Sequence, residues 1–521
     1  MLESHPDATF ISPEQAQEAY GIDTGGALRN LAGAVIVHEA SAVPRILEIA
    51  NRNRLKLWPI SGGRNFGYGT ALPAGEGNLI VDLGRLKRIE YFADSQTFTI
   101  EPGVTQQDLA DYLDAQGLNY LVPTTGVGPN GNLLGNALDG GYGLTPVADH
   151  FEALTAIDGF WGNGEPFGHS YEALGCHDMA RRWSAGLGPS VQSLLRQGNF
   201  AIVTRATVRL ARAPESCRVL IFEWPSDDAF FTGQDALSRL VEELPMLGGI
   251  IAMNGPRILA TQDDAPLTSP LKGAARQAHL DALCKERRIA AWTGVGTLYG
   301  PHATLSGVVK DLRRRLPGVR ILSFTPSQIR RMHTLAAYLP RQMFPTVRRH
   351  LGSLVDTLGT VEGRPIVAFL RIAYALDASL PAMDATRHPA KDGQGILWYA
   401  PLVPFTEAGV RAYAQFTSEI LMRHGFDPLL AVTTRSSRVH SGTIPLNFLK
   451  TSEAPTAAKA CYQELVDAGI AAGMPPYRIG TDFMESVYAE AGSMQDLTWQ
   501  RIGEVLDPNA VVSPGRYSRP R

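Results

Sequence analysis

A glycine-rich loop at residues 59–69, with the sequence PISGGRNFGYG, constrains the fold of this chain more than any other segment. It follows a predicted strand, and four of its eleven residues are glycines. Small residues let backbone N–H groups approach an anion closely, and successive donors in a turn form a concave site for a pyrophosphate. The loop therefore indicates a phosphate-binding turn at the end of a strand.

Two common phosphate-binding motifs do not fit this loop. Gly67 is followed by Tyr68 rather than by Lys and Ser or Thr, which excludes a P-loop. The GxGxxG spacing and its long following helix are missing, which excludes a Rossmann fingerprint. Taken alone, the segment also fits a glycine-rich surface turn, so the interpretation needs other segments.

The composition is that of an ordinary globular protein. At about 150 residues per domain, 521 residues permit two to four domains. A hydrophobic content of 44% with 19% charged residues excludes a disordered, collagen-like or coiled-coil chain. The net charge is −3, from 48 Lys and Arg against 51 Asp and Glu. The chain therefore has no overall positive field to hold nucleic acid or an anionic membrane.

The cysteines and the N-terminus favour a plain soluble protein. The four cysteines are far apart and form no CxxC spacing, so we predict neither a metal site nor a disulfide framework. The start, MLESHPDATF, is polar and unlike a signal peptide. No apolar run reaches the roughly 18 residues that a membrane span needs. We therefore expect a cytoplasmic location.

Residues 1–215 are predicted to form a mixed α/β unit. Apolar residues near a 3.6 period favour helices, and alternation favours strands. The predicted elements are a helix over 40–56, a strand over 57–63, strand–turn–strand over 78–104, a helix over 105–117, a hairpin at Asn163–Gly164 and strands over 199–214. The helix over 105–117 has Thr105 as its N-cap and Gly117 at C′.

Residues 216–474 are predicted to form a separate α+β domain, with helices over 273–290 and 303–316 and strands over 363–376 and 394–405. The basic clusters at 312–315 and 347–349 contain no aromatic residues, and we interpret them as solvated helix faces. The last segment is predicted to hold an amphipathic helix over 481–506 and a turn-rich tail.

Several small-residue segments follow the glycine loop in a characteristic order: 82–84, 101–104, 123–150 and 198–204. With the Tyr477–Arg478 pair and DPNAVVSPGR at 507–516, they resemble the vanillyl-alcohol oxidase/4-cresol dehydrogenase flavoprotein family. The resemblance covers residues 20–215 and 400–521. It implies an α+β fold with a discontinuous FAD-binding domain, 1–215 and 475–521, and a cap or substrate domain, 216–474.

The resemblance implies one bound FAD, cradled by the two glycine segments. The residues that match the family's cofactor-binding positions are Pro59, Ser61, Gly62, Gly63, Arg64, Asn65, Gly67, Gly69, Gly135, Asn136 and Val203.

Three residues match the family's phenolate-binding positions: Tyr68, Tyr477 and Arg478. The family oxidises para-substituted phenols, and the phenolate form makes hydride loss from the benzylic carbon easy. Two phenols and a guanidinium would favour the charged form of a bound phenol. A packed loop tyrosine and an interdomain ion pair are the structural alternatives for Tyr68 and Arg478.

Asp149 matches the family's aspartate beside the flavin, where it acts as a base or a charge stabiliser. The alternative is a turn or N-cap residue, because aspartate is common in both. His150 is interpreted as a structural residue or a backbone hydrogen-bonding partner.

The sequence departs from the family pattern in the cap. Ile396 occupies the position where many members attach FAD covalently, so we predict non-covalent FAD, with Tyr399 as a substitute only if the register is shifted. Arg438 and Val439 replace two family histidines, with His440 after them. Arg438 is a candidate contact for an anionic substrate, or else a solvated charge. Trp398 is a candidate substrate-pocket wall, although core packing also fits.

The resemblance as a whole implies an FAD oxidase or dehydrogenase that oxidises a para-substituted phenol by hydride transfer via a quinone methide. It also implies a homodimer, with oxygen or a cytochrome as electron acceptor. The alternatives are an FAD oxidoreductase of the same superfamily acting on a hydroxy acid, lactone or sugar, and a flavin-binding protein with little turnover.

Overall fold

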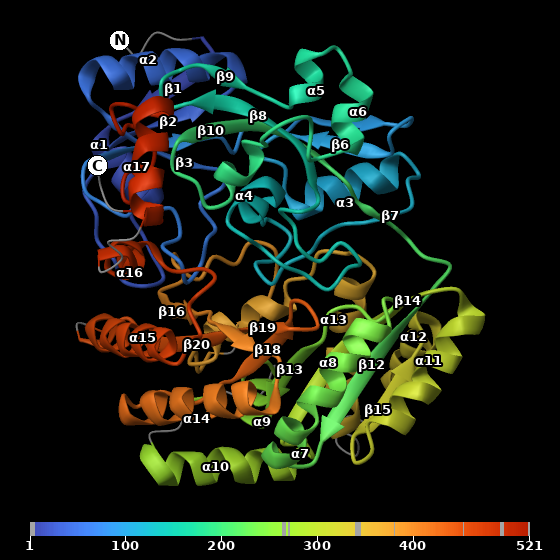
Figure 1. The fold of residues 1–521 in the computed structure, drawn as a ribbon. Helices are drawn as coiled ribbons and strands as arrows, with labels where there is room; N and C mark the ends of the chain where they lie inside the picture. The colour runs from blue at the N-terminus through green and yellow to red at the C-terminus, as the bar shows by residue number, and fades with distance from the viewer. Residues whose placement is uncertain are drawn as a thin grey trace.

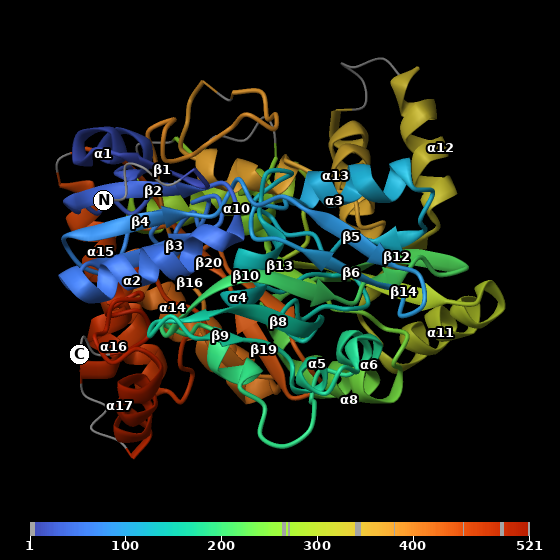
Figure 2. The ribbon, with the colours of Figure 1, turned by 90° about the horizontal axis from the view of Figure 1, so that it is seen from above.

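The computed structural model describes residues 6–262, 267–268, 271–338, 345–379, 381–451, 453–489 and 494–518. These ranges form helices and sheets in an upper and a lower part, shown in Figure 1, with both termini on the same side (Figure 2). The α+β fold class predicted from the sequence is confirmed. No helix within these ranges combines the length and the apolar character that a membrane span requires.

The first sheet presents the glycine loop. Its strands are ordered β1 (Ala8–Ile11), β2 (Leu31–Val37), β4 (Asn78–Asp82) and β3 (Lys56–Ile60), and β2, β4 and β3 are parallel. Helix α2 (Val43–Asn53) buries its 3.6-period apolar face against this sheet, and α1 (Pro13–Tyr20) lies beside β2. The glycine loop starts at the carboxyl end of β3, where open α/β sheets bind ligands.

The second sheet is antiparallel, in the order β5 (Ile89–Phe92), β6 (Thr97–Ile100), β10 (Ala201–Val208), β8 (Leu154–Trp161) and β9 (Pro166–Phe167). Helices α3 (Gln106–Ala115) and α4 (Leu133–Leu138) share its hydrophobic core. The predicted caps of α3 are confirmed: Thr105 and Asp108 form a capping box, and Gly117 has φ +63°. The predicted Asn163–Gly164 turn joins β8 to β9. Small elements complete this part: β7 (Tyr120–Leu121) with β11 (Ala211–Arg212), α5 (Ser170–Ala173) and α6 (His177–Arg182).

The lower part is built on a seven-stranded antiparallel sheet. Its order is β15 (Arg320–Phe324), β12 (Ser216–Trp224), β14 (Trp292–Gly300), β13 (Ile251–Asn254), β18 (Ala431–Thr434), β19 (Val439–Gly442) and β17 (Leu402–Pro404). A two-stranded sheet, β16 (Gln394–Tyr399) with β20 (Ile444–Leu449), lies between this sheet and the upper part. The helices are α7 (Asp227–Thr232), α8 (Gln234–Glu243), α9 (Gly255–Ala260), α10 (Gly273–Glu286), α11 (His302–Arg315), α12 (Pro326–Ala337), α13 (Pro345–Val361), α14 (Glu407–Arg423) and α15 (Ala454–Ala471).

Two elements differ from their sequence predictions. The apolar segment 363–376, predicted as a strand, contains a 3₁₀ helix, Ala368–Tyr374, because a short apolar run fits a buried strand and a buried helical turn equally well. The helix predicted over 481–506 is divided into a 3₁₀ turn (Thr481–Phe483), α16 (Met484–Ala489) and α17 (Met494–Leu506). Residues 490–493, between α16 and α17, lie outside the described ranges.

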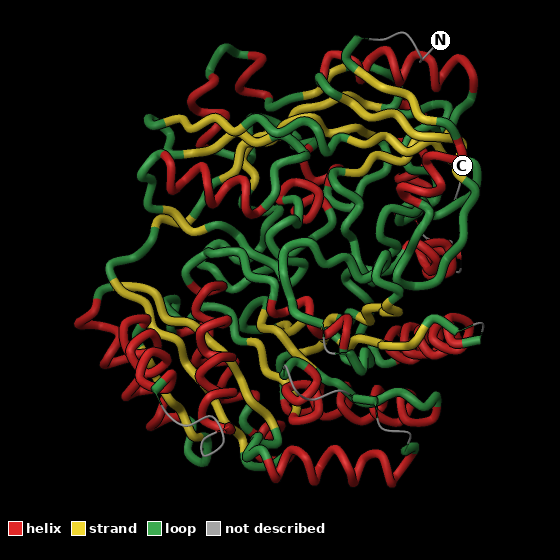
Figure 3. Tube along the Cα trace, turned by 180° about the vertical axis from the view of Figure 1, so that it is seen from behind, coloured by secondary structure: helices red, strands yellow, loops and turns green. Residues whose placement is uncertain are grey.

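Loops from distant parts of the sequence meet between the upper and lower parts, as the band of loops across the middle of Figure 3 shows. The backbone of Leu57 hydrogen-bonds to Val511 and Ser513 of the C-terminal tail. The Trp398 backbone N–H donates to the Gly67 carbonyl oxygen at 3.2 Å. The tail therefore pairs with the strand that leads into the glycine loop, and β16 bonds to the loop itself.

Candidate active site

A crevice of about 1080 Å³ lies between the two parts, at the upper end of the range for ligand pockets. Its upper wall comes from the glycine loop and from residues of the 124–144 and 194–203 segments. Its lower wall comes from residues of the seven-stranded sheet, α9, α13 and β16. Residues 477–484 and 513–516 complete it.

The glycine loop fits an anionic ligand. The backbone N–H groups of residues 62–64 donate to no group in the described ranges, so three successive donors are free, while Asn65 forms a β-bridge with Thr70. Gly62 lies so close to Asn132 that an added Cβ would come within 2.3 Å of its Oδ1, and one at Gly135 would come within 2.3 Å of the Ser61 Oγ. The glycines thus bring the loop and α4 together, and the free donors suit a pyrophosphate such as that of FAD.

Most predicted cofactor-binding residues line the crevice: Pro59, Ser61, Gly62, Gly63, Arg64, Asn65, Gly135, Asn136 and Val203. Gly67 and Gly69 do not line it. An added Cβ at Gly67 would come within 2.1 Å of the Trp398 ring, and one at Gly69 within 2.2 Å of the Thr481 Oγ1. These two glycines make room for neighbouring side chains.

The three predicted phenolate-binding residues come together in the crevice. The Arg478 guanidinium lies over the Tyr68 ring, 4.4 Å from its centroid. Tyr477 also lines the crevice, and the Arg435 Cζ lies 4.1 Å from the centroid of its ring. Burial raises the pKa of Tyr68 well above its ordinary value, and Tyr477 adds to this effect while Arg478 opposes it. Tyr68 is therefore a neutral hydroxyl at physiological pH.

Asp139, which the sequence analysis did not single out, organises this cluster. Its Oδ2 accepts from the Arg478 Nη2 at 2.5 Å, and its Oδ1 accepts from the Arg516 Nη2 at 2.8 Å. Asn65 also joins the cluster, because its Oδ1 accepts from Arg478 at 2.5 Å. Burial alone would lower the pKa of Arg478, but Asp139 and the nearby tyrosines raise it above its usual range. Two guanidinium groups and one carboxylate leave a net charge of +1.

Arg435 is a second crevice residue that sequence reasoning missed as a candidate. Its guanidinium lies 4.1 Å from the ring centroids of both Tyr142 and Tyr477. Its Nε donates to Ser441, while its two terminal nitrogens have no hydrogen-bond partner in the described ranges. Nothing in the sequence favours Arg435 over Arg438, three positions later.

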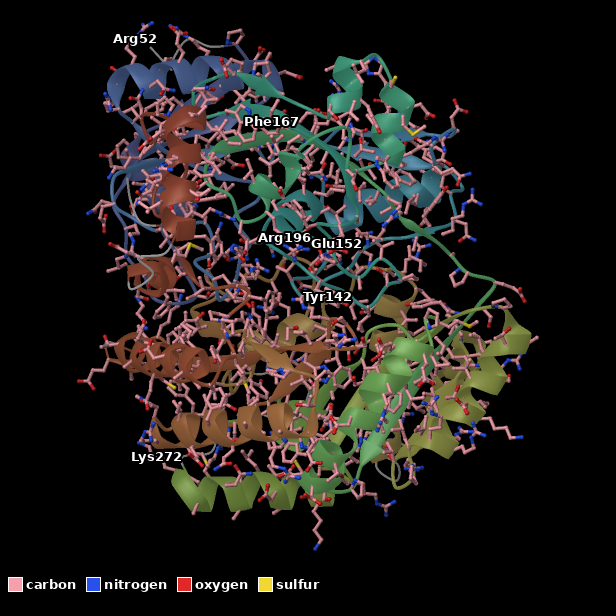
Figure 4. All side chains as sticks on the ribbon, in the orientation of Figure 1. Arg52, Tyr142, Glu152, Phe167, Arg196 and Lys272 are labelled. Atoms are coloured by element: carbon pink, nitrogen blue, oxygen red, sulfur yellow. The ribbon has the colours of Figure 1, made fainter. Side chains whose placement is uncertain are left out.

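Asp149 makes the contacts of a turn residue. Its Oδ1 accepts from the backbone N–H groups of Phe151 and Glu152, and its Oδ2 pairs with Arg196 at 2.9 Å. Figure 4 labels Arg196, Glu152 and Tyr142 in the central band. Asp149 is not among the crevice residues, so the turn alternative left open by the sequence describes its surroundings.

His150 is buried, and its Nδ1 lies 2.7 Å from the Asn136 Nδ2. Burial lowers the pKa of His150 to about 4, so its imidazole is neutral at physiological pH. The structure therefore places it as a support for Asn136, which lines the crevice.

The residues around the expected flavin linkage divide between crevice and core. Ile396 and Trp398 line the crevice. Tyr399 is fully buried in the core against α15, where an added Cβ at Gly469 would come within 2.1 Å of its hydroxyl. The Tyr399 side chain therefore faces away from the crevice, as alternation along a strand requires.

Arg438 lies outside the crevice, contrary to its expected substrate contact. Its side chain is 80% exposed and pairs with Glu242 at 3.5 Å. It sits in the turn between β18 and β19, which points to solvent. His440 is buried against Phe405, and its Nε2 lies 3.1 Å from the Gln234 Oε1. The solvated-charge alternative therefore describes Arg438.

Comparisons with known proteins agree with this site. A model of an FAD binding domain matches residues 31–164. The chain is 26% identical to the 1′-carboxy-chondrochloren decarboxylase of Chondromyces crocatus, covering 98% of this chain and 94% of that protein. It is 22% identical to the flavoprotein subunit of 4-cresol dehydrogenase (hydroxylating) of Pseudomonas putida, covering 93% and 87%.

The crystal structure of p-cresol methylhydroxylase with substrate bound superposes with a TM-score of 0.84 at 20% identity, covering 99% of this chain and 94% of that one. This likeness concerns the fold, while the domain match and the relatives concern the sequence. The free donors of the glycine loop and the crevice between the two parts fit FAD as the cofactor. The chain is therefore an FAD-dependent oxidoreductase, and it is similar to proteins of the vanillyl-alcohol oxidase/4-cresol dehydrogenase type, in agreement with the resemblance found in its sequence.

Proposed function

We propose that this enzyme oxidises a para-substituted phenol at its benzylic carbon, via a quinone methide. The observation that carries the proposal is the cluster of buried Tyr68 with half-buried Tyr477 and Arg478 in one crevice with the cofactor loop. A hydroxy acid, lactone or sugar substrate would not need these three groups together. The relative named 4-cresol dehydrogenase supports the same substrate class.

The cluster is built to accept one negative charge. Its net charge of +1 comes from Arg478, Arg516 and Asp139. A phenolate oxygen at this point would neutralise the cluster, and an opposite charge within a few ångströms lowers the pKa of a bound phenol. Neutral Tyr68 can donate its hydroxyl proton to the same oxygen, because its raised pKa keeps that proton in place.

FAD, when bound, supplies the acceptor for the hydride that leaves the benzylic carbon. The chain supplies the geometry: residues 59–65 and α4 would hold the cofactor, and β16 lies along the crevice. The cluster fixes the phenol oxygen, so the para carbon has a defined position.

A second candidate is an oxidative decarboxylation, in which the benzylic carbon loses a hydride to FAD and a carboxylate on the next carbon then leaves as CO₂, its bond pair forming the side-chain double bond while the phenolate is restored. The relative named a decarboxylase suggests it. Arg435 favours this reaction, because its terminal nitrogens have no hydrogen-bond partner in the described ranges. A substrate carboxylate could accept hydrogen bonds from them.

The test is anaerobic bleaching of the purified holoenzyme. We expect 4-alkylphenols to bleach the flavin and lactate to leave it oxidised. Bleaching by lactate alone would contradict the proposal, and no bleaching by any phenol or hydroxy acid would favour a flavin-binding protein with little turnover. Release of CO₂ from a 4-hydroxyphenyl carboxylic acid would identify the second candidate.

The acceptor and the assembly stay predictions. We infer oxygen or a cytochrome as acceptor, a homodimer, and a cytoplasmic location. Reoxidation of the reduced enzyme in air, followed by stopped flow, separates an oxidase from a dehydrogenase. Light scattering measures the oligomeric state.

A further inference from the structure

Arg257 is a buried cation with no anionic partner among the residues that the structure describes. It belongs to α9, next to β13, and its residue is 8% exposed. Its Nε and Nη1 atoms are buried and have no hydrogen-bond partner in the described ranges. No ion pair within those ranges involves it, whereas the buried Arg276 is paired with Asp427 at 2.7 Å. Buried charges in proteins are normally paired, so the isolation of Arg257 needs a reason.

The Arg257 guanidinium faces the crevice. Arg257 is one of its lining residues, with Met253 and Thr293 from neighbouring strands. Its Cζ lies 5.1 Å from the centroid of the Trp398 ring. The same ring lies close to Gly67, the residue before Tyr68. Trp398 therefore contacts both Arg257 and the glycine loop, and Arg257 and Arg478 line the same crevice.

Arg257 keeps its charge in this setting. Burial lowers its pKa to about 10, and Tyr413 is the group that opposes this shift. The guanidinium is thus protonated at neutral pH and lacks a counterion from the described chain. The backbone does not depend on it, because the Asn254 side chain caps α9 by accepting from the Arg257 backbone N–H at 3.1 Å.

We propose that Arg257 binds a carboxylate on the para side chain of the phenolic substrate. The substrate class is then an aromatic hydroxy acid, anchored by its phenolate at Arg478 and by its carboxylate at Arg257. This inference rests on the proposed function, because it assumes that the phenol end occupies the Tyr68 cluster. The Arg257 Nη2, like Nε and Nη1, has no hydrogen-bond partner in the described ranges, and Nη2 with either neighbouring nitrogen can donate two parallel hydrogen bonds to a carboxylate.

The experiment measures binding to the holoenzyme by the change in flavin absorbance, using phenols that cannot lose a benzylic hydride. Two pairs differ only in charge: 4-hydroxybenzoate with 4-hydroxybenzamide, and the longer 4-hydroxycinnamate with its amide. We expect one acid at least to bind about tenfold to a hundredfold more tightly than its amide. Arg257→Met should abolish this preference, and Arg257→Lys should restore part of it. Arg438→Met, at an exposed arginine, should leave it unchanged.

Thermal melting of the holoenzyme separates this role from a structural one. Arg257→Met removes an unpaired buried charge, so the variant should melt at or above the wild-type temperature and retain FAD. Equal binding of acids and amides at both lengths overturns the proposal. So does an anion preference that survives Arg257→Met, or a variant that loses its FAD and melts well below wild type.

Cinnamate, which lacks the phenol, distinguishes the two hypotheses. If the phenol site is correct, cinnamate binds more weakly than 4-hydroxycinnamate in wild type. If cinnamate binds equally well and Arg257→Met weakens it, the carboxylate site stands and the phenol proposal fails. If 4-alkylphenols bleach the flavin while every amide binds as tightly as its acid, the phenol proposal stands and the carboxylate site fails.

Discussion

Replacing Arg478 by leucine tests the phenolate site with little damage to the fold. Arg478 contacts the Tyr68 ring on one side and Asp139 on the other. After the substitution, Asp139 still pairs with Arg516 at 2.8 Å, so no buried carboxylate is orphaned. Asp139→Ala would leave Arg478 and Arg516 without their carboxylate partner, and breaking a buried ion pair costs about 3–5 kcal/mol. Arg478→Leu is therefore the cleaner perturbation.

The expected effect follows from the charge of the cluster. Arg478→Leu changes it from +1 to 0 and removes a charge-assisted hydrogen bond to the phenolate, worth about 1.5–3 kcal/mol. At about 1.4 kcal/mol per decade, flavin reduction by a phenol should fall about tenfold to a hundredfold. The pKa of a bound phenol should rise by about one to two units relative to the wild-type complex.

The assay is the ultraviolet absorbance of a bound, unreactive para-substituted phenol as a function of pH. In wild type the phenolate band should appear well below the solution pKa of the phenol, and in Arg478→Leu the transition should move upward. Stopped-flow reduction with a reactive phenol measures the rate, and Arg438→Leu serves as an exposed control. A wild-type complex that shows only neutral phenol, or a variant that reduces as fast as wild type, would refute the reasoning.

Three further predictions address the cofactor, the turn and the pH dependence of stability. FAD should enter the supernatant on acid precipitation, because Ile396 cannot form a covalent link; a fluorescent band on a denaturing gel would contradict this. Asp149→Asn should keep the rate of flavin reduction within about threefold, because the carboxylate binds Arg196 and the turn; a loss of about 10²–10⁴ would restore its role as a base. Burial lowers the pKa of His150 to about 4 in the folded protein, so the unfolded chain binds the proton more readily. The neutral His150 therefore contributes fully to the free energy of unfolding above about pH 6.5, and this contribution is lost as the pH falls towards 4. His150→Gln should reduce the loss between pH 7 and 4.5 by about 2–3 kcal/mol in urea unfolding, and an unchanged pH dependence would contradict this.

Local chemistry made the upper part of the fold predictable. The Thr105 capping box and Gly117 fixed both ends of α3 from short-range contacts alone. Segment 363–376 was not predictable in the same way, because its apolar residues are buried whether the backbone is extended or helical. The surrounding structure, including β16 and β20, decides between the two.

The candidate site shows the same division. Tyr68, Tyr477 and Arg478 could be found because they lie within ordered motifs. Asp139 lies in the same glycine segment, but only the fold shows that its carboxylate meets Arg478 and Arg516, hundreds of residues away. Asp149 had the better motif match, yet its carboxylate is held by its own turn. The partners of a carboxylate depend on which segments the fold brings close to it, and no local sequence pattern encodes this.

The sequence by itself was enough to predict the fold class, the FAD cofactor and, as candidates, Tyr68, Tyr477 and Arg478, because ordered glycine segments and short motifs carry the resemblance to a known family. Only the tertiary structure decided which arginines face the crevice. Arg438 and Arg435 stand three residues apart, yet a turn sends the first to solvent, and Tyr142 and Tyr477 hold the second in the crevice. Arg257, on a short helix with no motif, became a candidate only because the fold buries it without a counterion in the described part of the chain. Burial and pairing depend on long-range packing, so they are properties of the folded chain.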